Sequence, residues 1–118
     1  MKGNPQDRQV VETADAALRE LSRRADDADL VVVKGPIMEV KQQVVAGMNY
    51  EISMLIGTTK EKCEGVKKGV ADFQRCPPDS AGYYRISVYK SWDRVYAWEG
   101  MEKMPETDLA EIWNNYEE

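Results

Sequence analysis

The chain has 118 residues, 42% of them hydrophobic, which indicates one compact domain with a core rather than a disordered chain. Its formal net charge of −5 argues against a nucleic-acid partner, because nucleic acids are bound by clustered lysine and arginine. The chain has no histidine, and no apolar run approaches the roughly 18 residues that cross a membrane. We therefore expect no histidine-based catalytic site, no metal or other cofactor, and no membrane partner.

The first predicted element is an amphipathic helix over residues 7–25. Small and aliphatic residues recur there at spacings of three and four, which places them on one helix face. They are Val10, Ala14, Ala17, Leu18, Leu21 and Ala25. The acidic run over residues 26–29 is expected to end the helix, because carboxylates at a helix C-terminus oppose the helix dipole.

The next predicted elements are extended. A short β-branched run over residues 30–33 is expected to break at Gly35 and Pro36, and a strand resumes over residues 37–45. After Gly47 the residues alternate between apolar and polar. The apolar set is Met48, Tyr50, Ile52, Met54 and Ile56, and the polar set is Asn49, Glu51 and Ser53. This period of two predicts a half-buried antiparallel strand that ends near residues 57–59.

Residues 58–82 form a long connection with little periodicity, and they contain the two cysteines, Cys63 and Cys76. One pair of cysteines cannot complete a four-cysteine zinc site. A disulfide would close a short loop, stabilise the fold by ~3 kcal/mol and imply an oxidising compartment. Two reduced, buried thiols are the alternative.

Two further strands and a tail complete the chain. Alternation at residues 84–88 predicts a strand, residues 90–93 a turn, and residues 95–101 a returning strand with a bulge at Gly100. From Pro105 onward, Leu109, Ile112, Trp113 and Tyr116 follow the stripe of a short amphipathic helix, with Asp108 at its N-cap. The overall prediction is an α+β fold, with one long helix packed across antiparallel strands that are joined as hairpins.

The predicted turn between the first two long strands is unusually apolar. Val44, Val45 and Ala46 stand where loops usually carry Asn, Asp, Ser or Gly. An apolar tip of this kind is a candidate for insertion into a groove of a partner. The alternative is that the two valines are ordinary strand residues of the core.

At this tip the sequence Gln-Val-Val-Ala-Gly resembles the Gln-x-Val-x-Gly signature of the cystatins, which inhibit papain-like cysteine proteases. Trp92 is similar to the tryptophan of the family's Pro-Trp pair, and Gly3 to its N-terminal glycine. The resemblance covers residues 3–101 and is closest to the secreted type 2 cystatins. The protease-binding residues that it implies are Gly3, Gln43, Val44, Val45, Ala46, Gly47, Ser91 and Trp92.

The resemblance implies a fold, a function and a location. The fold is cystatin-like, with the helix across a curved antiparallel sheet of four to five strands. Residues 1–104 form the single domain, and residues 105–118 a C-terminal extension. The function is reversible, tight-binding, competitive inhibition of papain-like proteases, without enzyme activity. A non-inhibitory binding or immunomodulatory cystatin is the alternative. The protein is expected to be a secreted monomer with a Cys63–Cys76 disulfide, and exchange of the helix and adjoining strand would give a swapped dimer.

The chain also departs from the family pattern. Ser91 replaces the usual proline, so we expect a looser second hairpin. Only two residues precede Gly3, so we expect a short N-terminal arm. The family's second disulfide is missing, with Tyr83 near the place of one of its cysteines. The asparagine that inhibits legumain-type proteases has no counterpart between the helix and the next strand, so we do not carry that activity over.

Overall fold

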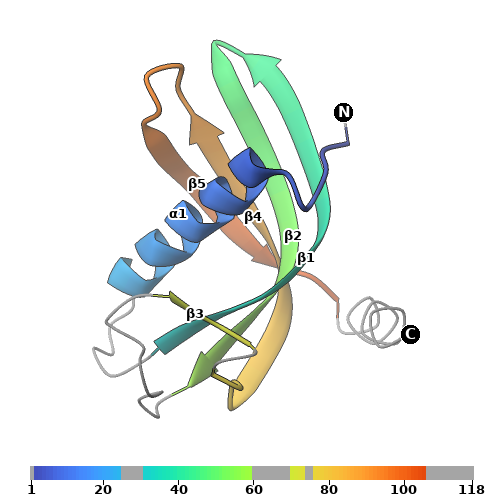
Figure 1. The fold of residues 1–118 in the computed structure, drawn as a ribbon, viewed down its shortest axis with the longest axis vertical. Helices are drawn as coiled ribbons and strands as arrows, with labels where there is room; N and C mark the ends of the chain where they lie inside the picture. The colour runs from blue at the N-terminus through green and yellow to red at the C-terminus, as the bar shows by residue number, and fades with distance from the viewer. Residues whose placement is uncertain (1, 25–30, 60–69, 74–75, 106–118) are drawn as a thin grey trace.

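The computed structural model describes residues 2–24, 31–59, 70–73 and 76–105, and it consists of one helix across a curved sheet (Figure 1). The elements are α1 (Arg8–Arg24), β1 (Val31–Val45), β2 (Gly47–Thr59), β3 (Val70–Asp72), β4 (Ser80–Lys90) and β5 (Tyr96–Lys103). The strand order is β3-β1-β2-β4-β5. The predicted α+β, cystatin-like architecture is confirmed. One addition was not predicted: β3, which lies in the long connection, pairs with β1 in parallel.

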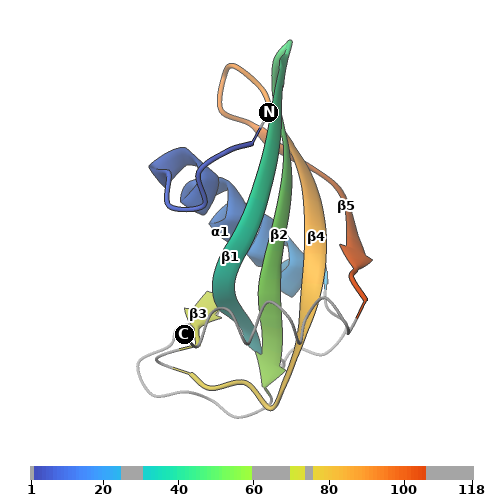
Figure 2. The ribbon, with the colours of Figure 1, turned by 90° about the vertical axis from the view of Figure 1, so that its right-hand side faces the viewer.

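Helix α1 is held at its start by a cap and along its length by small buried residues. The Asp7 carboxylate accepts a hydrogen bond from the Gln9 N–H at 2.8 Å, which satisfies one of the free donors of the first turn. Figure 2 shows α1 on one side of the sheet. Its buried face packs on aliphatic residues of β1, β2 and β4. The helix residues on this face are Val10, Thr13, Ala14, Ala17 and Leu18.

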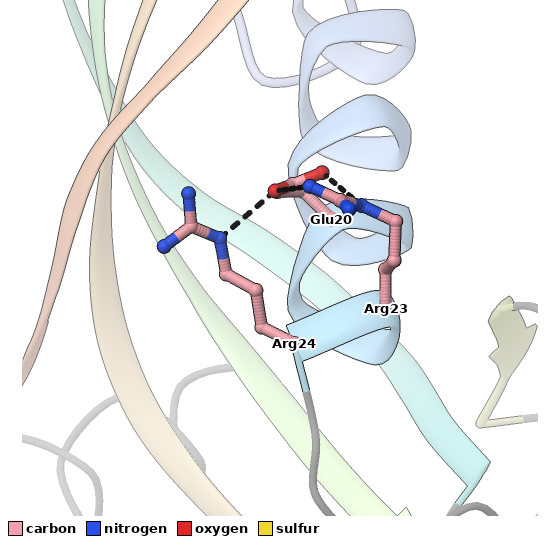
Figure 3. Close-up of polar contacts among 3 residues, drawn as sticks. All are labelled: Glu20, Arg23 and Arg24. Carbon is pink, nitrogen blue, oxygen red and sulfur yellow. Dashed lines mark hydrogen bonds and ion pairs between the residues drawn. The ribbon is translucent and has the colours of Figure 1, made fainter.

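The last turn of α1 carries an exposed ion-pair cluster (Figure 3). The Glu20 carboxylate accepts hydrogen bonds from Arg23 at 2.5 and 3.0 Å and from Arg24 at 2.8 Å. These bonds lower the pKa of Glu20 from 4.5 to about 2. Arg24 also lies 6.0 Å from the centre of the Trp98 ring of β5, which ties the end of the helix to the sheet. The acidic run over residues 26–29 lies outside the described residues.

Strand β1 is longer than the sequence predicts. The expected break at Gly35 and Pro36 was wrong, because β1 runs through both residues with register shifts on either side of Ile37. Proline has no N–H to donate, and β1 tolerates this loss at Pro36 because its pairing with β3 ends at Lys34 and its register with β2 is irregular there. Gly35 fits a close approach, since a Cβ atom there would lie 2.7 Å from the Cβ of Leu55. The irregularity therefore bends the strand without ending it.

Strands β2, β4 and β5 occur where the alternation predicts them, with two corrections: β4 begins at Ser80, inside the predicted connection, and β2 is buried on both faces at its centre, where Ser53 and Leu55 are at most 3% exposed. Alternating residues of β2 face α1, and Ile52, Met54 and Ile56 are at most 4% exposed. Strands β4 and β5 form the second hairpin, and their register shifts after Ser87, which pairs with Gly100. Gly100 has a φ of 153°, so the predicted bulge is confirmed. The predicted helical stripe in the tail lies outside the described residues.

Candidate functional site

Two hairpins reach one end of the sheet, and the N-terminal segment lies beside β1 five to six residues before the first hairpin turn. The β1–β2 and β4–β5 hairpins both reach the same end of the molecule in Figures 1 and 2. The N-terminal segment runs beside the upper part of β1, where Lys2 pairs with Lys41. This end, which we call the hairpin end, contains residues 43–47 at the first hairpin and residues 91–92 at the second. The third predicted element, Gly3, lies beside β1 at Val40, six residues before the turn at Ala46.

The first hairpin turns at Ala46, because Val45 pairs with Gly47 and Val44 with Met48. The Val44 side chain is 57% exposed and the Val45 side chain 41% exposed. Gln43 and Ala46 are exposed too. Both valines are therefore strand residues without being core residues, and the alternative that they belong to the core was wrong. The tip presents apolar surface to solvent.

The tip of the first hairpin is held by Tyr89, a residue of β4 that sequence reasoning missed. Its hydroxyl donates a hydrogen bond to the carbonyl of Ala46, and its ring lies over Gly47. A Cβ atom on Gly47 would lie 2.5 Å from the Lys90 carbonyl oxygen and 2.7 Å from the Tyr89 hydroxyl. Gly47 also has a φ of 134°, which a residue with a side chain rarely adopts. Glycine is required here for both reasons.

The second hairpin is closed by Ser91. Its N–H donates to the Val95 carbonyl at 2.9 Å, and its hydroxyl accepts from the Val95 N–H at 3.1 Å and donates to Asp93. The Arg94 N–H donates to the Ser91 carbonyl at 3.0 Å, with Arg94 at a positive φ of 65°. We expected serine to leave this loop looser than proline. Instead, Ser91 supplies hydrogen bonds that proline, which has no N–H, could not all make.

The closed loop places two large apolar side chains in solvent. Trp92 is 69% exposed, so the sequence prediction that it points outward at the turn is confirmed. Val95 is 60% exposed and was not singled out from the sequence. Its signal was available, since an aliphatic residue at the end of a polar turn has no strand neighbour to cover it. Together they give the second hairpin an apolar tip like that of the first.

The N-terminal segment is fixed to β1 at Gly3. The Gly3 N–H donates to the Val40 carbonyl at 2.8 Å, next to the bridge between Lys2 and Lys41. A Cβ atom on Gly3 would lie 2.6 Å from the Gln42 Oε1 and 2.9 Å from the Val40 Cγ1. Glycine therefore allows the segment to approach β1 closely at Val40 and Gln42, in the half of β1 that leads to the first hairpin.

The exposed apolar residues are concentrated at the hairpin end. Five large hydrophobic residues are exposed within the described part of the chain, and four of them are Val44, Val45, Trp92 and Val95. No group of three or more potential metal-binding side chains occurs among the described residues. In that part of the chain, no helix is long and apolar enough to span a membrane. The hairpin end therefore offers exposed apolar side chains for contact with a partner, and hydrogen bonds hold the two turns that carry them.

The predicted disulfide falls only in part within the described residues. Cys76 is fully buried and packs with Val33 in a small second cluster on the sheet. No cysteine in the described part of the chain is free. Cys63 lies outside the described residues, so the pairing stays a prediction.

Comparison with known proteins gives a family and a fold. The profile of the cystatin domain family matches residues 1–86, well over half of the chain. The chain resembles the salivary cystatin of the soft tick Ornithodoros moubata, with a TM-score of 0.66 and 20% identity over 89% of this chain and 95% of that one. It also resembles a protein named Al-CPI, with a TM-score of 0.64 and 16% identity over 88% and 97% of the two chains. No curated protein sequence matches.

Proposed function

The chain belongs to the cystatin family, and we propose that it is a reversible, tight-binding, competitive inhibitor of papain-like cysteine proteases. One observation carries the proposal. Four of the five exposed large hydrophobic residues in the described chain lie on two hairpin tips at one end of the sheet, and the N-terminal segment is fixed to β1 below the first tip. In the proposed mechanism, this hairpin end enters the active-site cleft as a wedge and excludes substrate.

The exposed apolar area is sufficient for tight binding if the wedge is already formed. An aromatic side chain buries roughly 150–250 Å². Trp92, at 69% exposure, therefore offers about 150 Å² or about 4 kcal/mol at ~25 cal/mol/Å². The three exposed valines add about 1 kcal/mol each, because full burial of a valine contributes about 1.5–3 kcal/mol. The gross gain of about 7 kcal/mol must offset the loss of translational and rotational freedom on association.

The hydrogen bonds at the two tips reduce this opposing cost. The carbonyl of Ala46 is tied to Tyr89, and Ser91 is tied to Val95 and Asp93. Little backbone freedom is therefore left to lose when the tips are buried. Valine and alanine also have few rotamers, so their immobilisation costs little. Such a preformed wedge supports tight binding more than the same residues on flexible loops would.

The proposed mechanism involves no bond making or breaking by this chain. Inhibition by exclusion needs no nucleophile, general base or metal ion, and the hairpin end presents valines, an alanine and a tryptophan instead. We accordingly propose that the protein is not an enzyme. The catalytic cysteine of the protease is blocked but not modified, so inhibition is reversible and competes with substrate.

A variant of the first tip tests the proposal. Val45→Asp places a charge in the proposed interface and should raise the inhibition constant against papain at least about 100-fold, because a buried unpaired charge costs several kcal/mol. Glu51→Gln changes an exposed residue of β2 away from the tip and serves as the matched control. Equal inhibition by all three proteins would contradict the proposed site. Binding of papain without inhibition would favour a non-inhibitory cystatin.

We also propose that Cys63 and Cys76 form a disulfide and that the protein is secreted. The full burial of Cys76 and its lack of a free thiol support the pairing. A disulfide that persists implies an oxidising compartment. Mass spectrometry after alkylation of the unfolded protein, with and without a reductant, tests the pairing. Incorporation of two alkyl groups into the unfolded but unreduced protein would show that the thiols are free.

A further inference from the structure

One residue of the second hairpin adopts a backbone conformation that does not suit its side chain. Arg94 has a φ of 65°, and within the described part of the chain it is the one residue other than glycine with a positive φ. A residue with a Cβ atom is strained in this left-handed region, where Gly, Asn and Asp are the usual residues. Strain of this kind is concentrated at functional sites, where the surrounding structure holds it in place.

The turn explains the conformation at position 94 but not the choice of arginine. The Arg94 N–H donates to the Ser91 carbonyl at 3.0 Å, and the Ser91 N–H donates to the Val95 carbonyl at 2.9 Å. These two bonds leave Trp92, Asp93 and Arg94 as a three-residue hairpin loop. Such a loop ends in one left-handed residue, for which glycine is the normal choice. The fold therefore requires the left-handed conformation, while glycine would satisfy it without strain.

The Arg94 side chain has no acidic partner in the described part of the chain. The residue is exposed, and the ion pairs found among the described residues do not include its guanidinium group. The neighbouring acid, Asp93, instead accepts the hydrogen bond of the Ser91 hydroxyl. A guanidinium group has five N–H donors in a planar fork. These donors therefore face solvent without a described carboxylate to bind.

The position of Arg94 puts this free charge inside the proposed interface. Arg94 is two residues from Trp92 and adjacent to Val95, which are the two exposed apolar side chains of the second tip. On the other side of the same loop, Lys90 places its ammonium group 5.6 Å from the centre of the Tyr96 ring. The second hairpin thus combines an apolar tip with a cation on each side, although the whole chain has a formal net charge of −5.

The chemistry of Arg94 indicates what a partner should present beside the tryptophan. A guanidinium group binds a carboxylate through two parallel N–H···O bonds, a geometry that an ammonium group cannot match. Cations beside a contact surface attract an acidic surface and repel a basic one, which gives specificity between related partners. The partner group that fits Arg94 is therefore a carboxylate next to the surface that contacts Trp92.

We propose that Arg94 is a specificity-determining residue, which binds a carboxylate on the rim of the protease cleft and favours papain-like proteases with an acidic rim. This inference rests on the proposed function and names the class of protease that the protein inhibits best. Lys90 contributes to the same preference from the other side of the loop. The hydrogen-bonded loop holds Arg94 in its strained conformation, so the charge is already in place when the protease binds.

A double-mutant cycle tests the proposal. The probe is a papain-like protease with carboxylates on the rim of its cleft, compared with a variant of that enzyme in which these carboxylates are amides. Arg94→Gln should raise the inhibition constant at least about 10-fold against the acidic enzyme and less than about threefold against the amide variant. Lys103→Gln is the matched control, because it removes one exposed positive charge at the far end of β5 and should leave both constants unchanged.

A second variant separates a role in binding from a role in folding. Arg94→Gly removes the side chain and allows the left-handed conformation without strain, so it should raise the Tm by about 2–4 °C. The same variant should weaken inhibition of the acidic enzyme about as much as Arg94→Gln does. A residue that is more stable as glycine but binds better as arginine is retained for its contact with the partner.

Three outcomes would overturn the proposal. The first is an equal effect of Arg94→Gln on the two enzymes, or no effect on either, while the unmodified protein inhibits both. The second is a lower Tm of Arg94→Gly, which would show that Arg94 supports the fold. The third is failure of the unmodified protein to inhibit either enzyme, which would overturn the proposed function together with this inference. The first two outcomes leave the proposed function standing.

Discussion

Replacement of Trp92 by alanine should weaken protease inhibition strongly and leave the fold unchanged. Trp92 is 69% exposed, so about 150 Å² of its surface is free to be buried by a protease, equivalent to about 4 kcal/mol gross. Truncation of a central aromatic contact typically costs 2–4 kcal/mol or more. We therefore expect the inhibition constant to rise roughly 30- to 1,000-fold. The free energy of unfolding should change by less than about 0.5 kcal/mol, because the side chain is in solvent.

The assay is the inhibition constant against papain, measured together with urea unfolding for the same protein samples. Met101→Ala is the matched control, because Met101 is also exposed and apolar, at 41%, but lies on β5 away from the hairpin end. The control should inhibit like the unmodified protein. If Trp92→Ala changed inhibition by less than threefold, or no more than the control, the second hairpin would not be part of the interface and the wedge would need revision.

Three further predictions concern the supports of the hairpin end and of the helix. Tyr89→Phe removes the hydroxyl that binds the Ala46 carbonyl but keeps the ring, so inhibition should weaken about 2- to 10-fold; an unchanged constant would mean that the bond does not hold the tip. Gly3→Ala places a Cβ atom 2.6 Å from the Gln42 Oε1, so the N-terminal segment should move off β1. The backbone amide of residue 3 should then exchange its hydrogen faster than in the unmodified protein; equal exchange rates in the two proteins would refute this close fit. The pKa of Glu20 is lowered to about 2, so its stabilising ion pairs are intact above pH 4.5 and are lost as the pH falls toward 2. Glu20→Gln should therefore lower the Tm at pH 7 and by much less at pH 2, and a constant difference across that range would contradict the assignment.

Local periodicity explains why much of the fold could be predicted from the sequence. The sequence predicts a helix over residues 7–25, because its apolar residues repeat at spacings of three and four, and the structure has it at Arg8–Arg24. The long β2 strand alternates in period two, and one of its faces packs on the helix as that pattern requires. These signals depend on neighbours along the chain. They need no knowledge of which strands pair.

Features that depend on pairing between distant residues could not be predicted. Gly35 and Pro36 are local breakers, yet β1 continues through them because β2 supplies partners on both sides of the irregularity. The parallel pairing of β3 with β1 has no signal in a three-residue strand. Burial of Leu55, on the face predicted to be polar, likewise depends on what covers the second side of the sheet.

In the candidate site, too, features set by local sequence could be predicted, and features set by the pairing of distant residues could not. The apolar tip at Val45 and the exposed Trp92 followed from residue types in turns, and a resemblance to a known signature connected them. The tie between Tyr89 and Ala46 joins residues 43 positions apart, so only the strand register reveals it. Ser91 was expected to weaken its loop because it replaces proline, but its hydrogen bonds to the loop are specific to the three-dimensional turn.

The most direct test of the central claim is a titration of active papain with the full-length chain at several substrate concentrations. The wedge predicts complete, reversible inhibition at one equivalent of protein, with an apparent inhibition constant that rises linearly with substrate concentration. Full papain activity at micromolar concentrations of the protein, or inhibition that substrate does not relieve, would contradict the claim that the hairpin end occupies the active-site cleft.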